Sequence, residues 1–361
     1  MEIETKKDFL FSIIVPVYNT EKYIEKCLNS IKEAIDVDCE VIIVNDGSTD
    51  NSEKIINEFI NKLPNCFKDN FVYIKKENKG LADTKNVGIE NARGKYISVV
   101  DSDDYISNDF YTIGRKYTDN YDVIIYDLYI VFEKNNKWNY TSRAYRDDKE
   151  KILEAFLNGA MSGSSCNKII KKELYNNNKF PVGKQYEDTA VTPFILVDAQ
   201  NIKYIPYPLY YYLQREKSIV ATNTLMSAFY KICSNISEVL EIKERSFEKY
   251  KYIINEFFVD RFLDIIVQDY NENKKEFINN LKEFYNNNTN VINYILESNI
   301  IFECENHYSD RQKNIVRDMI VLISNNNYKK VKQLLFKRKI VNYIRTLKGS
   351  FINFLKSIVN K

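Results

Sequence analysis

Acidic residues follow two runs of β-forming residues, and their spacing suits the binding of a phosphorylated ligand. Asp101, Ser102 and Asp103 come directly after one such run, so a single residue separates two carboxylates. Carboxylates in this arrangement suit a divalent cation bound to a diphosphate, since Mg²⁺ and Mn²⁺ prefer carboxylate, water and phosphate oxygens. Asp46 follows an earlier run, where it could accept hydrogen bonds from a base or from ribose hydroxyls. These residues predict a site for a nucleoside diphosphate.

Three basic residues near these segments could balance the negative charge of a diphosphate: Lys79, Lys85 and Arg93. The sequence contains neither G-x-x-x-x-G-K-[ST] nor G-x-G-x-x-G, the two glycine-rich patterns that cradle phosphates at the start of a helix. We therefore expect a nucleotide site that is built without a P-loop.

The segments that carry these residues alternate between β-strand and α-helix in the first third of the chain. The predicted strands are residues 11–17, 40–44, 71–77 and 95–100, and the predicted helices are residues 20–34, 52–63 and 81–92, the last closed by Gly94. Strands that alternate with helices imply right-handed βαβ units and a mostly parallel sheet. The carboxyl ends of the strands would then meet at one edge, which is where open α/β sheets bind ligands.

The pattern changes after Asp122. We predict antiparallel strands over residues 121–134 and 137–145, a helix over 148–157, a small-residue loop leading into a helix over 161–175, a helix over 185–199, and a last strand with its exit loop over 202–219. Beyond residue 221 the apolar spacing is helical. These patterns predict an α/β domain over residues 1–220 and an all-helical domain over residues 221–361, with the boundary near residues 218–225.

Composition excludes several classes of protein. The 52 basic and 50 acidic residues leave a formal net charge of +2, whereas a dedicated nucleic-acid binder carries a clear basic excess. The six cysteines form no Cys-x-x-Cys pair, which is typical of reduced thiols in a cytoplasmic protein. We expect no signal peptide, because the apolar run at residues 9–17 is short and contains Pro16. No stretch approaches the roughly 20 apolar residues that a membrane-spanning helix needs.

Four motifs of the chain, taken in order, resemble one enzyme family. They are SIIVPVYNTEKYIEKCLNSI, VIIVNDGSTDNS, ENKGLADTKNVGIENARGKYISVVDSDDYI and QYEDTAV. Together they resemble the inverting family 2 glycosyltransferases with the GT-A fold, bacterial enzymes that build surface polysaccharides. The resemblance covers roughly residues 9–220. It implies a Rossmann-like, mostly parallel sheet domain that moves a sugar from a nucleotide-diphosphate sugar, a UDP-sugar above all, to a hydroxyl of a glycan or a lipid-linked acceptor.

The resemblance also implies roles for individual residues. Asp188 would be the catalytic base, and Asp103 would bind the divalent metal, Mn²⁺ or Mg²⁺. Gln214 resembles a residue of the exit loop that closes over the donor diphosphate. The nucleotide-sugar-binding residues would be Pro16, Val17, Tyr18, Asn19, Asp46, Lys79, Asn86, Asp101, Ser102, Asp103, Arg215 and Ser218.

Some of these residues also have simpler interpretations. The chain has Lys85 where the family usually has arginine, so the cation is kept but its bidentate geometry is not. Asp188 could merely favour the start of a helix, as acids commonly do. Lys168 could be a solvated helix charge or could line the acceptor side. We interpret the tyrosine cluster at residues 207–212 as core and strand surface, and His307 as an ordinary surface residue rather than a metal ligand.

The last segment, residues 328–361, differs from the rest because no acidic residue follows Asp318 while lysines and arginines accumulate. Its apolar residues fall largely at helical spacing, so the segment predicts a basic amphipathic tail. Such a helix can lie on an anionic membrane surface. Alternatively, its apolar face packs on the helical domain or on a second copy of the chain, which leaves a homo-oligomer open.

Two other functions are compatible with an α/β nucleotide site. A sugar-nucleotide pyrophosphorylase would need a glycine-rich, arginine-containing loop after the first strand, and PVYNTEKY contains neither residue. A non-catalytic binding module should have lost some of the four key carboxylates, and Asp46, Asp101, Asp103 and Asp188 are all present.

Overall fold

The computed structural model describes residues 8–132, 138–141, 148–157, 161–214, 225–242, 246–303 and 309–336. The chain separates into two compact units. The first comprises Met1–Phe156 and Ala160–Ser218, and the second comprises Leu157–Gly159 and Ile219–Lys361. The assignment of residues 1–220 and 221–361 to separate domains stays a prediction. The first unit contains the sheet, and the second is helical in its described part.

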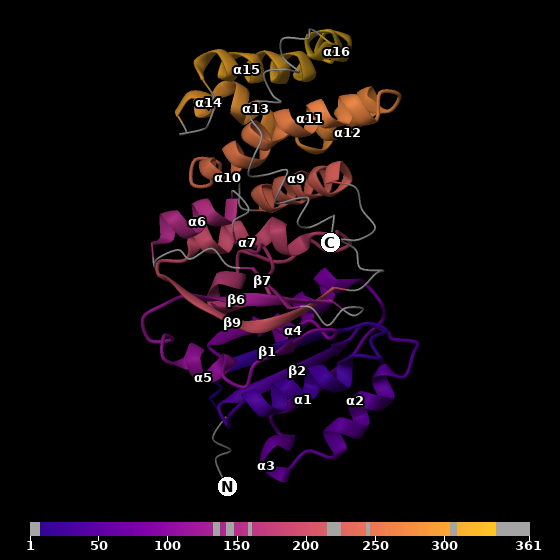
Figure 1. Ribbon diagram of the computed structural model, residues 1–361, viewed down its shortest axis with the longest axis vertical. Helices are drawn as coiled ribbons and strands as arrows, with labels where there is room; N and C mark the ends of the chain where they lie inside the picture. The colour runs from indigo at the N-terminus through magenta and orange to yellow at the C-terminus, as the bar shows by residue number, and fades with distance from the viewer. Residues whose placement is uncertain are drawn as a thin grey trace. The chain divides into compact units, whose positions relative to one another are not determined.

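The described strands of the first unit form a nine-stranded sheet in the order β3-β2-β1-β4-β8-β6-β9-β5, with β7 paired to β6 (Figure 1). The strands are β1 Phe11–Val17, β2 Cys39–Asn45, β3 Phe71–Lys75, β4 Tyr96–Val99, β5 Tyr105–Ile106, β6 Val123–Phe132, β7 Trp138–Thr141, β8 Lys168–Lys171 and β9 Ile202–Gln214. Strand β1 pairs in parallel with β2 and β4, and β2 pairs in parallel with β3. The predicted parallel arrangement of the first four strands is therefore confirmed.

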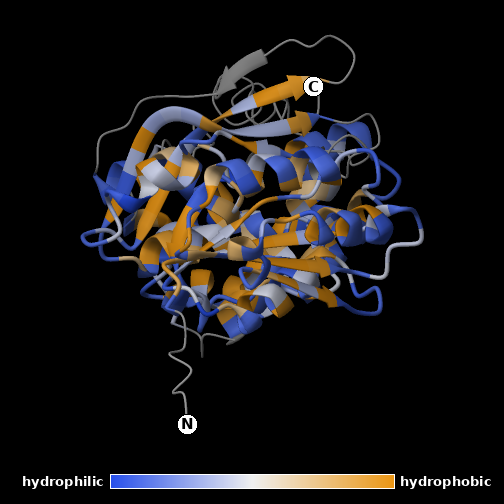
Figure 2. Ribbon diagram, turned by 90° about the horizontal axis from the view of Figure 1, so that it is seen from below, coloured by the Kyte–Doolittle hydropathy of each residue, from blue (hydrophilic) through white to orange (hydrophobic). Residues whose placement is uncertain are grey.

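The central parallel strands β1, β2 and β4 are buried on both faces, which is why their sequences read as continuous apolar runs. Every residue of β1 and of β2 is buried. The helices of this unit are α1 Ile24–Ala34, α2 Ser52–Asn61, α3 Asn65–Lys68, α4 Leu81–Asn91, α5 Phe110–Arg115, α6 Lys149–Leu157 and α7 Glu187–Asp198. In Figure 2 the strands are largely orange and the connecting loops largely blue, as expected for a sheet at the centre of its unit.

The later strands make the sheet mixed. Strand β8 is antiparallel to both of its neighbours, β4 and β6, and β7 is antiparallel to β6. Strands β6 and β9 run parallel to each other, with register shifts around Asp127. The prediction of antiparallel strands at residues 121–134 and 137–145 is confirmed for their described parts.

Two local predictions are wrong. Residues 161–175 lead into the strand β8 and the 3-10 helix Lys172–Tyr175, not into an α-helix, because the β-branched Ile169 and Ile170 are buried in the sheet between β4 and β6. Lys168 is consequently a buried strand residue and not a solvated helix charge. Gly94 does not close α4 in a left-handed conformation. A Cβ at Gly94 would lie 2.6 Å from the Ser12 nitrogen, so the glycine permits close backbone approach.

The described part of the second unit consists of packed helices. They are α9 Leu225–Ile242, α10 Lys251–Asn255, a π-helix at Glu256–Asp260, α11 Arg261–Glu272, α12 Phe277–Asn287, α13 Thr289–Glu297, α14 Ile300–Glu303, α15 Asp310–Ser324 and α16 Tyr328–Phe336. Helix α16 contains the start of the predicted basic tail, and it packs against α15, α11 and α12. Of the helices in the described ranges, none has both the length and the apolar character that crossing a bilayer requires.

Candidate active site

The ends of β1 and β2 are tied together at the carboxyl edge of the sheet. The Asp46 nitrogen donates a hydrogen bond to the Val17 carbonyl at 2.8 Å. Asn19 has a left-handed backbone with φ of 51°, and its Oδ1 accepts a hydrogen bond from the Thr49 nitrogen at 2.8 Å. The predicted convergence of these strand ends is therefore observed. Pro16 and Val17 are buried there, while Tyr18 is 50% exposed.

The carboxylate of Asp46 organises the turn before α4. It accepts hydrogen bonds from the backbone nitrogens of Lys79, at 2.9 Å, and Gly80, at 2.8 Å, and it pairs with Lys76. Gly80 supplies a φ of 91°, which a side chain would strain. The arrangement positions Lys79 through its backbone. A contact between Asp46 or Lys79 and a nucleotide stays a prediction.

The segment after β4 carries two carboxylates with different surroundings, Asp101 and Asp104. Asp101 Oδ1 is buried and has no hydrogen-bond partner among the residues that the structure describes. Asp104 differs, because it accepts hydrogen bonds from the Tyr210 hydroxyl and from the Leu213 nitrogen, both at 2.7 Å. Asp104 thereby ties this segment to β9, while Asp101 Oδ1 is left without such a partner among the described residues. Ser102, which directly follows Asp101 in the sequence, is buried.

Ligand atoms of Asp101, Asp104 and Cys166 lie within 4.8 Å of one another, close enough to hold a metal ion. Burial raises the pKa of the Cys166 thiol well above its ordinary value, and hard cations prefer oxygen. Both Asp104 oxygens already accept hydrogen bonds, so within this group the Asp101 carboxylate fits Mg²⁺ or Mn²⁺ best. Burial, opposed by Lys85, raises the pKa of Asp101 to about 7. Asp103 lies next to this group in sequence but is not part of it, and its role as the metal ligand stays a prediction.

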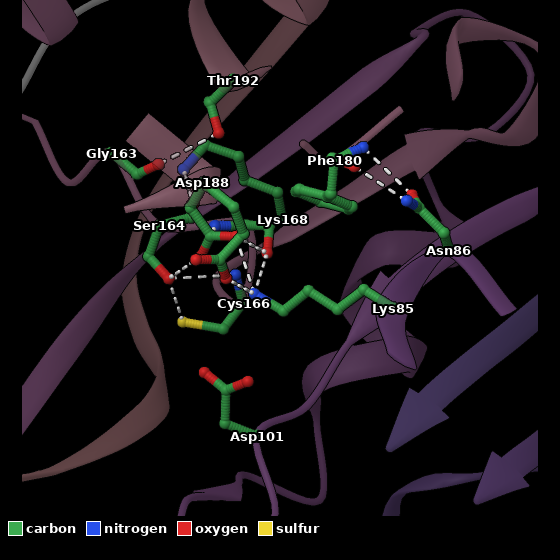
Figure 3. A network of polar contacts seen from close by, with 12 residues as sticks. Lys85, Asn86, Asp101, Gly163, Ser164, Cys166, Lys168, Phe180, Asp188 and Thr192 are labelled. Carbon is green, nitrogen blue, oxygen red and sulfur yellow. Dashed lines mark hydrogen bonds and ion pairs between the residues drawn. The ribbon is translucent and has the colours of Figure 1, made fainter. Parts of the chain in front are cut away.

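Asp188 lies in the first turn of α7, directly after Tyr186 and Glu187 at a sharp bend. Tyr186 has a left-handed backbone with φ of 62°, which turns the chain into the helix. The Asp188 carboxylate pairs with Lys85 Nζ at 2.7 Å and accepts hydrogen bonds from the Ser165 nitrogen at 3.1 Å and the Ser165 hydroxyl at 3.0 Å (Figure 3). Its contacts therefore join α4, the segment before β8 and the start of α7, which are distant in sequence. An acid that only favoured the start of its own helix would not make these contacts.

Lys85 is 1% exposed and lies between two carboxylates, with Glu187 at 2.9 Å and Asp188 at 2.7 Å. Burial opposes the charge on Lys85, but both acids outweigh it and raise its pKa well above the ordinary value. Burial likewise raises the pKa of Asp188, but Lys85 and the Ser165 hydrogen bonds outweigh it, so the pKa of Asp188 is lowered. Burial keeps the pKa of Glu187 above its ordinary value. Asp188 thus keeps its charge to lower pH than Glu187 does.

This pairing was not predicted from the sequence, in which Lys85 was expected to balance the charge of a diphosphate. The available signal was the position of Lys85 on the buried face of α4, three residues after Ala82 and four before Ile89. A cation on a buried helix face requires a nearby acid, because an unpaired buried charge is costly.

Asn86 is tied to the backbone of Phe180. Its side chain forms two hydrogen bonds with the backbone of Phe180, at 2.8 and 3.0 Å, and the Phe180 ring centroid lies 5.2 Å from Lys85 Nζ. The predicted nucleotide-sugar contact of Asn86 stays a prediction. Arg215, Ser218 and His307 lie outside the described residues, and Gln214 ends β9.

The tyrosines of β9 belong to the core and to the strand surface. Tyr210 is fully buried, and Tyr211 stacks on Tyr105 at 4.6 Å and on Tyr129 at 5.3 Å between ring centroids. These aromatic contacts agree with the interpretation of the cluster as packing rather than as a platform for a sugar.

Comparison with known proteins adds a family to this geometry. The family model described as "Glycosyl transferase family 2" matches residues 12–178. The chain is 35% identical over 218 residues to EpsH of Bacillus subtilis (strain 168), covering 58% of this chain and 62% of that protein. It is 34% identical over 227 residues to the glycosyltransferase GlyG of Streptococcus pneumoniae serotype 4, covering 59% of this chain and 73% of GlyG. The match to EpsH thus spans less than two thirds of that relative.

Among solved structures, the chain is similar to residues 1–349 of S. aureus TarS, solved in complex with UDP-GlcNAc. The TM-score is 0.65 at 20% identity, and the match covers 94% of this chain and 93% of the TarS chain. At this identity the likeness establishes the fold, a GT-A sheet domain followed by helices.

Proposed function

Since the chain belongs to glycosyl transferase family 2 and is therefore a glycosyltransferase, we propose that it transfers a sugar from a nucleotide-diphosphate sugar to an acceptor hydroxyl with inversion. One observation carries the proposal. Asp188, held ionised by Lys85, belongs to the same buried group of charges as Asp101, whose Oδ1 has no hydrogen-bond partner among the described residues. Figure 3 shows the Asp101 carboxylate pointing toward the Asp188–Lys85 pair.

In the proposed reaction Asp188 accepts the proton of the acceptor hydroxyl. The acceptor oxygen forms a bond to the anomeric carbon on the face opposite the leaving group, and the bond from that carbon to the diphosphate oxygen breaks with its electron pair. A single displacement of this kind inverts the configuration. Lys85 keeps Asp188 ionised before the reaction, and the proton moves as the attacking hydroxyl becomes more acidic.

The acidic segment 101–104 would hold the cation. We assign Asp103 as a ligand from the family resemblance, and the unused oxygen of Asp101 supports a cation at this segment. A bound Mn²⁺ or Mg²⁺ would neutralise the charge that develops on the departing diphosphate. Arg215 and Ser218 are predicted to assist the cation by contacting the same diphosphate.

We further propose a UDP-sugar as the donor and a glycan or lipid-linked hydroxyl as the acceptor, in bacterial surface polysaccharide synthesis in the cytoplasm or at the inner face of the plasma membrane. The structure of TarS with UDP-GlcNAc, which shares the fold, supports a uridine donor. The acceptor part of the proposal is supported by the resemblance of the four motifs to polysaccharide-building enzymes.

Release of UDP from a panel of UDP-sugars, with Mn²⁺ and with glycan acceptors, tests the proposal. Asp188→Asn should reduce transfer by ~10²–10⁴-fold and leave UDP affinity nearly unchanged, because the base contacts the acceptor and not the nucleotide. The matched control is Asp198→Asn, the same change at the last residue of α7, which should keep its activity. Wild-type turnover by Asp188→Asn would refute Asp188 as the base. Nucleotide binding without turnover of any donor would favour a binding module, and exchange of pyrophosphate into a nucleotide sugar would favour a pyrophosphorylase.

A further inference from the structure

The loop of residues 162–166, which we call the serine loop, holds the Asp188 carboxylate together with Lys85. The Ser165 nitrogen and hydroxyl donate hydrogen bonds to the Asp188 carboxylate, and the Ser164 hydroxyl donates another at 3.3 Å (Figure 3). These donors belong to a short segment without helix or strand structure. Hydrogen bonds within the loop, from the Ser164 nitrogen to the Ser162 hydroxyl and from the Cys166 nitrogen to the Ser164 hydroxyl, both at 3.3 Å, bend it locally. Contacts with Lys168 and Thr192 anchor it to the rest of the unit.

The first residue of β8, Lys168, lies behind the serine loop. Its side chain is fully buried, and its ammonium donates hydrogen bonds to the Ser162 carbonyl at 3.0 Å, the Ser164 carbonyl at 2.5 Å and Asn167 Oδ1 at 2.8 Å. A lysine ammonium carries three N–H donors, so these neutral oxygens use all of them. The backbone of Lys168 is fixed in turn, because β8 pairs with β6 with Lys168 opposite Ile125.

One peptide unit connects Lys168 to Asp188. The Ser164 carbonyl, which accepts from Lys168, and the Ser165 N–H, which donates to Asp188, belong to the same planar trans peptide. In such a unit the carbonyl and the N–H point in opposite directions. Holding the Ser164 oxygen on the ammonium therefore aims the Ser165 N–H at the carboxylate.

A second tie comes from the helix that carries Asp188. The Thr192 hydroxyl, one turn after Asp188 in α7, donates a hydrogen bond to the Gly163 carbonyl at 3.0 Å. Carbonyls 162, 163 and 164 thus all face groups of the protein interior, while the donors of residues 164 and 165 face Asp188. Burying an ammonium against neutral oxygens costs free energy, so an apolar residue at 168 would be the cheaper choice for packing alone.

We propose that Lys168 is a positioning residue of the transfer reaction, which orients the Ser164–Ser165 peptide and through it fixes the direction and the ionisation of Asp188. The inference rests on the proposed role of Asp188 as the base. Lys168 itself contacts neither substrate. Its removal should rotate the serine loop, withdraw hydrogen bonds from Asp188 and raise the pH at which Asp188 takes up a proton.

The test compares Lys168→Met with the wild type in three measurements: turnover, UDP affinity and the pH dependence of kcat. The acidic limb of the pH profile reports the protonation of Asp188. We expect kcat to fall by up to about 10²-fold, as misplacement of a reacting group typically costs, with UDP affinity unchanged and the acidic limb moved to higher pH. Ser165→Ala should move the limb in the same direction, and adding it to Lys168→Met should have less than its separate effect. Lys171→Met, a lysine of the same strand that pairs with Asp122, is the matched control and should leave the limb in place.

The other charged or titratable groups near Asp188, which are Lys85, Glu187, Asp101, Cys166 and Tyr175, remain in all these variants. Lys168→Met also removes a positive charge that interacts with Asp188, so the shift of the limb in Ser165→Ala, which leaves every charge in place, is the one attributed to the serine loop. Lys168→Gln, which keeps a neutral donor, should restore part of the turnover. A folded Lys168→Met with wild-type kcat and limb would overturn the inference, and so would loss of folding in both lysine variants, because the role would then be structural. If Asp188→Asn itself keeps full turnover, the proposed base is wrong, which is a different result.

Discussion

At the scale of single residues, the site depends on how one buried lysine is shared between two acids. Lys85 neutralises a charge that Glu187 and Asp188 would otherwise hold together in a buried space. The compact ammonium of lysine suits this location between two carboxylates, whereas the planar guanidinium of arginine suits one bidentate partner. The difference between the pKa directions of Glu187 and Asp188 follows, since Asp188 also accepts the hydrogen bonds of Ser165.

The metal site gives a prediction at the same scale. EDTA should silence the wild type, and Asp103→Ala should remove the metal dependence of UDP binding measured by calorimetry. Asp104→Ala should instead lower the melting temperature, because Asp104 accepts hydrogen bonds from Tyr210 and Leu213 and its removal leaves their donors unpaired. The cost is about 1–3 kcal/mol for an unsatisfied buried donor.

Two results would contradict this division of roles. Full activity in EDTA would show that basic side chains alone manage the diphosphate. A normal metal dependence in Asp103→Ala, together with its loss in Asp101→Asn, would move the ligand role from Asp103 to Asp101.

At the scale of elements, the distance between α4 and β1 decides where Lys85 lies. Helix α4 packs on β1 and β2, and Gly88 lies against Ile14 of β1. A Cβ at Gly88 would lie 2.3 Å from Ile14 Cγ2, closer than van der Waals contact allows. Lys85 and Gly88 both belong to the buried face of α4, so the depth of packing at Gly88 sets how far the ammonium reaches toward Asp188.

Gly88→Ala should therefore weaken both the fold and the reaction. Alanine gains up to about 1 kcal/mol of helix propensity over glycine, but overpacking costs about 1–3 kcal/mol, so we expect a net loss of stability in thermal unfolding. Turnover should fall as well, because α4 moves outward and carries Lys85 with it. The control is Asn91→Ala at the exposed end of α4, which gains propensity without a clash.

A double variant identifies the cause. Ile14→Ala removes the Cγ2 atom, so Gly88→Ala combined with Ile14→Ala should lose less stability than the sum of the two single changes. Additive losses, or a Gly88→Ala protein as stable and active as the wild type, would mean that the helix position tolerates the added methyl group.

At the scale of the whole chain, all described residues of the candidate site belong to the first unit, and the described second unit is a set of packed helices. The predicted basic tail begins in α16, where Val331 and Leu335 are fully buried. The apolar stripe of α16 thus packs within its own unit. We therefore expect a membrane contact, if the tail makes one, from residues 337–361. These lie outside the described residues and contain basic but no acidic side chains.

Truncation after Phe336 tests that contact without disturbing α16. The full chain should float with anionic liposomes, more weakly as salt is added, and the truncated chain should not. Hydrolysis of a soluble UDP-sugar should be the same in both, whereas transfer to a lipid-linked acceptor should drop on truncation. Neutral liposomes are the control for apolar adsorption. If neither protein floats and truncation lowers the melting temperature, the segment packs on protein instead.

Sequence alone determined the features that depend on local chemistry. The apolar runs of β1 and β2, the polar turn at Asp46, the carboxylates after β4 and the acids at the start of α7 could all be located, because strand periodicity, turn residues and helix starts are properties of a few neighbouring residues. Tertiary structure alone decided the contacts that join these segments. Lys85 meets Asp188 across 103 positions of sequence, and Lys168 is buried because β8 enters the sheet between β4 and β6. Burial and strand pairing over the whole domain decide which segments come into contact. Neither can be read from the few residues on either side of Lys85, Asp188 or Lys168.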